Sequence, residues 1–263
     1  MSIASPLRRA LRSVRARARR LGERALEPYL GSVFGVDTAR RVAALTFDDG
    51  PHPEYTPRLL DSLARHGARA TFFVVGAAVR AQPELAARIV AEGHALANHT
   101  WDHRSLPTLS PAARLEQLRR CAAALAPYGG DHGLLRPPFG NQSRASRVEA
   151  LRLGYQVIAW SDHAEDWLER DAAFIAERLA AGLEPGAILL LHDSLYRVAE
   201  PERADRSPTL AAVEATLARF PDYAFVTVPE LLASGRLRRR MWFKNPEADW
   251  LARFEGVADP FES

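Results

Sequence analysis

The sequence has a single cysteine, a single lysine and no long hydrophobic run. Cys121 alone cannot form an intramolecular disulfide, which excludes a disulfide-stapled fold and fits a reducing compartment. No apolar stretch reaches the ~18 residues of a membrane-spanning helix. Arginines interrupt every apolar stretch near the N-terminus, so no signal peptide is recognisable. We therefore expect the protein in the cytoplasm or peripherally at the inner membrane surface.

Arginine supplies almost all of the positive charge, because Lys244 is the only lysine. The formal net charge is +3, yet the first 22 residues carry seven arginines and no acid. Apolar side chains in this arm recur at helical spacing, at Leu7, Leu11, Val14, Ala18 and Leu21. Residues 1–40 therefore form either an amphipathic arm on an anionic membrane surface or a segment that packs on the domain or frays. No aromatic platform accompanies the arginines, which argues against nucleic-acid binding.

The length of 263 residues and the 47% hydrophobic content suit one large α/β domain or two small ones. From Val42 onward, short apolar runs alternate with longer amphipathic stretches. The apolar runs predict strands at residues 41–47, 70–76, 94–100, 134–140, 155–161, 187–194 and 223–228. The amphipathic stretches predict helices at residues 56–67, 83–93, from 110 onward, 170–182 and 208–220. This alternation predicts a parallel sheet covered by helices, either open or closed into a barrel.

Polar side chains suited to chemistry stand at the carboxyl ends of the predicted strands. They are Asp48 and Asp49, His99, Arg136, Asp162, and His192 with Asp193. Barrel enzymes assemble their active sites at that rim. The pattern therefore favours an enzyme over a structural protein.

The adjacent carboxylates of TFDDGP, Asp48 and Asp49, have two interpretations. One is a solvated turn, since Asp and Gly are ordinary turn residues. The other is that one carboxylate binds a cation while its neighbour acts as a base, because close carboxylates repel unless a positive charge lies beside them. The second interpretation requires further ligands elsewhere in the chain.

ALANHTWDHRSL contains such ligands in His99 and His103. Their spacing of four places both imidazoles on one side of a helical turn. With a carboxylate from another strand they form an Asp-His-His set that leaves positions open for water and substrate. The alternative is a pair of surface histidines. Asp102, between them, caps or solvates rather than ligates.

Two further residues have both a structural and a catalytic interpretation. Arg136 is either a surface arginine before a proline turn or the partner that keeps the free aspartate ionised. His192 follows an apolar strand, so it is either a core histidine bonded to backbone or a desolvated catalytic imidazole. In the catalytic interpretation Asp166 is its carboxylate neighbour.

Five segments in this order, TFDDGP, HTWDH, RPPFG, DW and LLLHD, resemble the motifs of the polysaccharide deacetylase family, the NodB-type carbohydrate esterases. The resemblance covers roughly residues 42–235. It implies a distorted (β/α) barrel of seven parallel strands. It also implies a metal-dependent hydrolase that removes acetyl groups from N-acetylated sugars in a glycan or aminosugar substrate.

The resemblance implies a metal set and a base. Asp49, His99 and His103 resemble the ligands of one divalent ion, with zinc the usual metal and cobalt, nickel or others tolerated. Asp48 resembles the catalytic base, which takes a proton from the attacking water. Arg136 resembles the residue that orients this base.

The remaining implied roles concern the leaving group and the substrate. His192 resembles the general acid that protonates the departing amine, and Asp166 the carboxylate that tunes it. The backbone N–H of Phe139 corresponds to the oxyanion donor. Trp167 and Leu190 resemble walls around the acetyl methyl group.

The chain departs from the family pattern at two positions, which bears on substrate preference. The third motif commonly ends in tyrosine, where this chain has Phe139. The fourth often has an acid where this chain has His163, beside Asp162. Alternative functions are a deformylase or deacetylase of a lipid-linked aminosugar, a glycan-binding module without turnover, and hydrolysis of a non-sugar amide.

We expect three segments in the chain. Residues 1–40 are the basic arm, 41–235 the catalytic domain, and 236–263 a C-terminal extension. The extension contains Trp242, Phe243, Trp250 and Phe254. This aromatic content predicts that it folds back on the domain or meets a partner. Oligomeric state has no signal in the sequence.

Overall fold

The computed structural model describes residues 22, 25–196, 198 and 201–246. At its centre is a curled sheet of eight strands, seven of them on one path in the order β6-β5-β4-β3-β2-β8-β7. The strands are β2 (Val42–Asp48), β3 (Ala70–Val74), β4 (Ala95–Asn98), β5 (Leu134–Leu135), β6 (Gln156–Val157), β7 (Asp162–His163), β8 (Ile188–His192) and β9 (Ala224–Phe225). β9 pairs with β2 off that path, and every pairing is parallel. The predicted α/β fold with seven parallel strands is confirmed.

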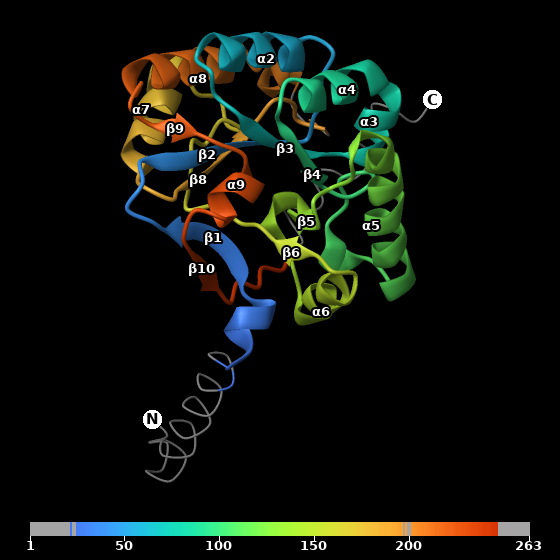
Figure 1. Ribbon diagram of the computed structural model, residues 1–263. Helices are drawn as coiled ribbons and strands as arrows, with labels where there is room; N and C mark the ends of the chain where they lie inside the picture. The colour runs from blue at the N-terminus through green and yellow to red at the C-terminus, as the bar shows by residue number, and fades with distance from the viewer. Residues whose placement is uncertain (1–21, 23–24, 197, 199–200, 247–263) are drawn as a thin grey trace, which may run out of the picture.

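Helices cover the outside of the sheet (Figure 1). They are α2 (Tyr55–Arg65), α3 (Gly76–Ala81), α4 (Pro83–Ala91), α5 (Pro111–Leu125), α6 (Arg144–Arg152), α7 (Ala172–Gly182) and α8 (Ser207–Arg219). A further helix, α9 (Val228–Leu232), packs instead with Ala44, Phe73 and Ile188 on the inner face of the curled sheet. Their starts follow ordinary capping chemistry. Ser110 accepts from Ala113 N–H at the start of α5, and Asp171 accepts from Phe174 N–H at the start of α7. Because the strands of this sheet all run parallel, their carboxyl ends meet at one rim.

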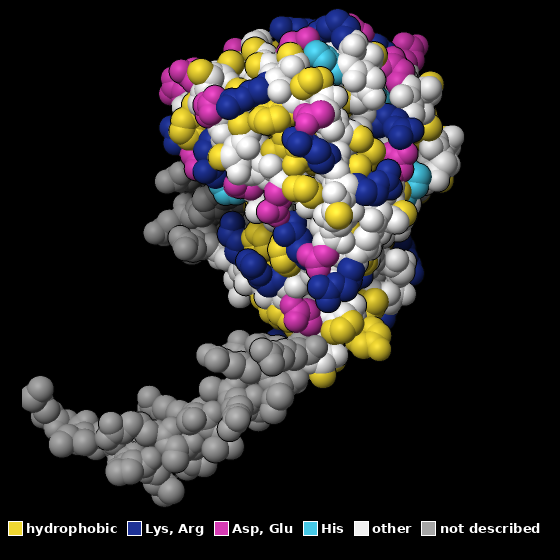
Figure 2. Space-filling view, turned by 60° about the vertical axis from the view of Figure 1, so that its left-hand side comes forward, with side chains coloured by type: hydrophobic (Ala, Val, Ile, Leu, Met, Phe, Trp, Pro, Cys, Tyr) yellow, Lys and Arg dark blue, Asp and Glu magenta, His cyan; other side chains and the backbone are white. Residues whose placement is uncertain are grey.

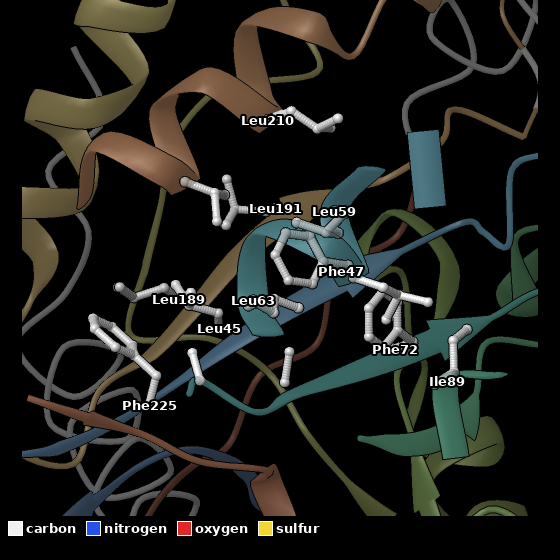
Figure 3. Packing of buried hydrophobic residues seen from close by; sticks show 14 of the residues in the cluster. Leu45, Phe47, Leu59, Leu63, Phe72, Ile89, Leu189, Leu191, Leu210 and Phe225 are labelled. Atoms are coloured by element: carbon white, nitrogen blue, oxygen red, sulfur yellow. The ribbon is translucent and has the colours of Figure 1, made fainter. Parts of the chain in front are cut away.

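The main hydrophobic core lies between the sheet and the helices α2, α4, α5, α7 and α8 (Figure 3). Leu45 and Phe47 of β2 point into it, and Phe47 stacks on Phe72 with ring centroids 5.4 Å apart. Side chains alternate along a strand. Thr46 and Asp48 therefore face the inside of the curled sheet. The alternation that buries Leu45 and Phe47 in the core thus directs the Asp48 carboxylate to the opposite face.

The predicted strand at residues 155–161 is wrong as a single element. Its first part is β6, which pairs with β5, and the chain then crosses to β7, which pairs with β8. β6 and β7 lie at opposite ends of the sheet, so residues 158–161 bring the two edges together. The change of partner, which has no signal in local composition, splits the strand.

A second sheet, absent from the prediction, covers this junction. β1 (Ser32–Asp37) pairs antiparallel with β10 (Arg236–Arg240). Val33 forms a bridge with Ile158, and Gly35 forms one with Ala187. Val33 is fully buried. Strands from the two ends of the described chain thus close the curled sheet where β6 and β7 do not pair.

Residues 1–21, which carry the apolar positions of the predicted amphipathic arm, lie outside the described residues, and so do Trp250 and Phe254. Residues 32–37 of the predicted arm form β1. None of the described helices is long and apolar enough to cross a membrane. Acidic and basic side chains are interspersed over the face in Figure 2. Arg236 pairs with Asp37 at 2.6 Å, and Arg238 pairs with Glu184 at 2.7 Å.

Candidate active site

The two aspartates at the end of β2 point to different partners because the backbone turns between them. Asp49 has a φ of 77°, a left-handed conformation that ends the strand. Its Oδ2 accepts the backbone N–H of Tyr196 at 3.1 Å. A side chain at Gly50 would overlap the Asp193 carboxylate, so the third residue of the turn must be glycine. The turn is therefore built into the protein interior, and the solvated-turn interpretation is wrong.

His99 and His103 converge on Asp49, but they do not lie on a helix as the spacing predicted. β4 ends at Asn98, and the following loop has positive φ values of 71° at Thr100 and 58° at His103. The Thr100 N–H donates to Asn98 Oδ1 at 2.9 Å. Local side-chain acceptors replace the helical hydrogen bonds and turn both imidazoles inward.

The three predicted metal ligands form one buried cluster. Asp49 Oδ1 lies 3.3 Å from His99 Nε2 and 3.0 Å from His103 Nε2. The three ligand atoms all lie within 4.8 Å of one another. Exposed fractions are 5% for Asp49, 1% for His99 and 6% for His103. This is the one such group of three found among the described residues.

Hydrogen bonding around the cluster leaves acceptors facing one another. His99 Nδ1 lies 2.6 Å from the Arg136 carbonyl oxygen, which can only accept, so Nδ1 carries the proton. The lone pair on Nε2 then faces the carboxylate oxygen Asp49 Oδ1. Two acceptors at this distance repel unless a cation lies between them. Both Asp49 Oδ1 and His103 Nδ1 are buried without a hydrogen bond in the described structure. The donor set fits a divalent ion.

The titration behaviour of the cluster fits the same conclusion. Burial would raise the pKa of Asp49, but positive charge on the neighbouring imidazoles, His103 first, holds it well below its ordinary value, so the carboxylate favours a cation beside it. Burial lowers the pKa of His103 by more than Asp49 raises it. A charged carboxylate and a neutral imidazole are the protonation states that bind metal ions.

Arg136 is fully buried and bound to Asp48. Its Nη1 donates to Asp48 Oδ1 at 2.6 Å and to Thr46 Oγ1 at 2.8 Å. Nη2 and Nε donate to the carbonyl oxygens of Ala159 and Ile158. A buried guanidinium with its donors satisfied keeps its charge. The surface interpretation of Arg136 is therefore wrong, and Asp48 has a cation beside it.

His192 and Asp166 make a two-point contact. His192 Nδ1 lies 2.9 Å from Asp166 Oδ1, and the His192 backbone N–H donates to Asp166 Oδ2 at 2.8 Å. Burial would lower the pKa of His192, but Asp166, with help from Asp49 and Asp48, raises it to about 9. In the parallel register His192 is the direct partner of Asp48. A protonated imidazole and an Arg-bound carboxylate therefore stand side by side on neighbouring strands.

The predicted substrate-contacting residues lie near His192 and His103. Trp167 packs edge-on against the His192 ring with centroids 5.6 Å apart. Leu190 is buried on β8, two residues before His192 and on the same face. Phe139 sits in the 3₁₀ turn η3 (Pro138–Gly140), with its ring 4.4 Å from that of His103. Asp162 lies away from the site, since it pairs with Arg178 at 3.1 Å.

Several supporting residues had no signal in the sequence. Arg206, only 2% exposed, donates from Nη1 to the Asp166 carbonyl at 2.5 Å. Thr209 donates to Asp166 Oδ2 at 3.3 Å. Thr56 donates to Asp193 beneath the Asp48-Asp49 turn. Each is distant along the chain from the group it holds, and each residue type is common on protein surfaces.

Comparison with known proteins gives consistent matches. The sequence profile described as polysaccharide deacetylase matches residues 35–158. The Listeria monocytogenes peptidoglycan-N-acetylglucosamine deacetylase PgdA is 36% identical over 197 residues, which are 74% of this chain and 39% of that protein. The Sinorhizobium fredii chitooligosaccharide deacetylase is 35% identical over 207 residues, covering 75% of this chain and 94% of that one.

Comparison with solved structures finds a match to the same family. The Bc1960 peptidoglycan N-acetylglucosamine deacetylase, in complex with a hydroxamate-type ligand, superposes with a TM-score of 0.72 at 26% identity. The match covers 80% of this chain and 96% of that one. The chain thus spans nearly all of some relatives and about two fifths of PgdA.

Proposed function

This chain belongs to the polysaccharide deacetylase family, and we propose that it is a metal-dependent hydrolase that removes acetyl groups from N-acetylated sugars. One observation carries the proposal. A buried Asp-His-His group adjoins a carboxylate held by Arg136 and an imidazole held by Asp166. That combination supplies a metal site, a base and an acid within one rim of the sheet.

Asp49, His99 and His103 would hold the ion, and their two nitrogen donors and one oxygen suit zinc, with cobalt or nickel as substitutes. When bound, such an ion polarises the amide carbonyl and lowers the pKa of water. The relatives are named for peptidoglycan and chito-oligosaccharide deacetylation. We therefore propose glycans that contain N-acetylated glucosamine units as the substrate class.

We assign proton transfer to the two groups that stand side by side at the ends of β2 and β8, Asp48 and His192. Asp48, bound by the Arg136 guanidinium, accepts a proton from the attacking water. His192 donates through Nδ1 to Asp166, so the proton that it delivers to the departing amine is the one on Nε2. The Phe139 N–H stabilises the negative charge that develops on the carbonyl oxygen. Trp167 and Leu190 border the acetyl methyl group.

The test is acetate release from chito-oligosaccharides, peptidoglycan fragments and acetylated xylan. The assay compares zinc- or cobalt-loaded enzyme with chelated enzyme and with Asp48→Asn. We expect release that requires metal and disappears in the variant. Absence of release from every substrate by protein that holds one metal ion per chain would contradict the proposed substrate class. Failure to bind any divalent ion would contradict the hydrolase itself.

A further inference from the structure

We infer that the C-terminal segment 241–244 is a positioning element for the turn that carries Phe139, acting through Trp242 and Lys244. The inference rests on the proposed function, in which the Phe139 N–H faces the developing oxyanion. Residues 241–244 follow β10 and lie beyond the five motifs and beyond the matched profile at residues 35–158.

The turn needs support from outside itself. Phe139 has a φ of 59° and Gly140 a φ of 66°, so two consecutive residues adopt left-handed backbone. A residue with a side chain rarely takes this conformation, and it persists where the surroundings impose it. The aim of the Phe139 N–H therefore depends on what holds η3 in place.

Lys244 holds the turn by its backbone and by its side chain. The Gln142 N–H donates to the Lys244 carbonyl at 2.9 Å, and the Lys244 N–H donates to the Gln142 carbonyl at 3.1 Å. Lys244 Nζ also donates to the Phe139 carbonyl oxygen at 3.3 Å. The chain's single lysine thus contacts the very residue that carries the proposed oxyanion donor.

Trp242 holds the turn from its other side by packing. Its ring meets that of Trp160 edge-on, with centroids 5.0 Å apart. Both rings lie against Gly140, where an added Cβ would come within 2.9 Å of Trp160 and 3.6 Å of Trp242. The cavity left between the two tryptophans and Arg136 is about 10 Å³, room for roughly one water. The turn has no space to swing toward Trp242.

This packing connects directly to the catalytic base. The Trp160 ring centroid lies 5.8 Å from the Arg136 guanidinium carbon, and Arg136 binds Asp48. Asn141, the next residue after the turn, donates to Ser105 in the loop that follows His103. Substituting Trp242 or Lys244 loosens the turn without removing a metal ligand or a proton-transfer residue.

The experiment measures kcat, KM and zinc affinity for Trp242→Ala, Lys244→Met and Lys244→Arg in the full chain. A donor displaced by about 1 Å can cost up to a hundredfold in rate, so we expect kcat to fall about tenfold in Trp242→Ala and about threefold in Lys244→Met. KM and zinc affinity stay within about twofold, since the lost interaction belongs to the transition state. Lys244→Arg, which keeps a donor, restores kcat.

A matched control is Arg219→Met, which removes an exposed cation that pairs with Glu177 on distant helices. Unchanged kcat in both Trp242→Ala and Lys244→Met, or a rise in KM alone, would overturn the inference while wild-type activity sustains the proposed function. If wild-type protein with bound zinc releases no acetate, the proposed function falls, and the role of the turn falls with it. Should Trp242→Ala fail to fold, the two Lys244 variants decide alone.

Discussion

At the scale of single residues, two neighbouring aspartates of the site have different partners and different expected roles. Asp48 and Asp49 are adjacent in sequence, but one is bound by Arg136 and the other faces two imidazoles. The positive φ at Asp49 separates them. Repulsion between the two carboxylates is offset because each has its own positive or polar partners.

This division predicts opposite outcomes for two isosteric substitutions. Asp49→Asn removes the charged ligand, so stoichiometric zinc binding should be lost. Asp48→Asn keeps the ligand set, so zinc affinity should stay within about tenfold while acetate release disappears. Metal content per chain and a chelator competition measure the difference. Equal loss of zinc in both variants would show that Asp48 is itself a ligand.

The pKa of His192 makes a second prediction at this scale. Its pKa is raised to about 9, chiefly because Asp166 offsets the effect of burial. An acid that must be protonated loses activity as pH rises through its pKa, so we expect the alkaline fall of kcat near pH 9. Asp166→Asn removes the charge, and the fall should shift by about one unit or more to lower pH. A profile of kcat between pH 5 and 10 tests this, with exposed Glu177→Gln as control. An alkaline limb that does not move would exclude Asp166 from this role.

At the scale of elements, the loop after β4 is held by the helix that follows it. Gln117 of α5 accepts two backbone N–H groups with one oxygen, from Trp101 at 3.0 Å and from Asp102 at 3.1 Å. Asn98 is buried at the strand end and donates to Leu118 on the same helix. α5 thus sets the aim of both imidazoles through the backbone of the loop.

Replacing Gln117 by leucine should therefore weaken metal binding. One buried and one partly buried N–H group lose their acceptor, and the loop between His99 and His103 relaxes. Loss of groups that orient ligands typically costs about 10–100-fold in metal affinity. Zinc competition with a chelating dye measures the change. Glu116→Leu, one position earlier and exposed on α5, is the control and should bind zinc normally; unchanged affinity in Gln117→Leu would refute the role of α5.

At the scale of the whole molecule, the positions of the site residues depend on how the strands that carry them pack in the hydrophobic core. Leu189 on β8 is 1% exposed and packs in the main hydrophobic core (Figure 3). Its side chain points to the opposite face of the strand from Leu190 and His192. β8 and β2 share the longest stretch of parallel register in the sheet. Their packing fixes the distance between acid and base.

We expect Leu189→Ala to lower the free energy of unfolding by about 2–5 kcal/mol, since it removes buried methyl groups and leaves a cavity. Leu151 is 44% exposed on α6, so Leu151→Ala should change the free energy of unfolding by less than about 0.5 kcal/mol. Urea denaturation followed by circular dichroism compares the two. Similar losses in both variants would contradict the assignment of the core.

Much of the fold followed from periodicity, because alternating apolar runs and amphipathic stretches are local properties. The runs at β2, β3 and β8 are nearly continuous, as expected for strands buried on both faces. β1 and β10 escaped prediction, since β10 reads RLRRR and has no apolar pattern. They form because each is the other's partner, a pairing of chain ends that no local window contains.

By itself the sequence determined which side chains stand at the ends of apolar runs, and therefore the chemical types available at one rim. Only the tertiary structure decided which of them meet. Arg136 joins Asp48 across 88 positions, Tyr196 joins Asp49 across 147, and Asp162 turns away to Arg178. Strand order, register and loop backbone set these contacts. They depend on the free energy of packing distant segments together, whereas residue type and spacing report only on neighbours along the chain.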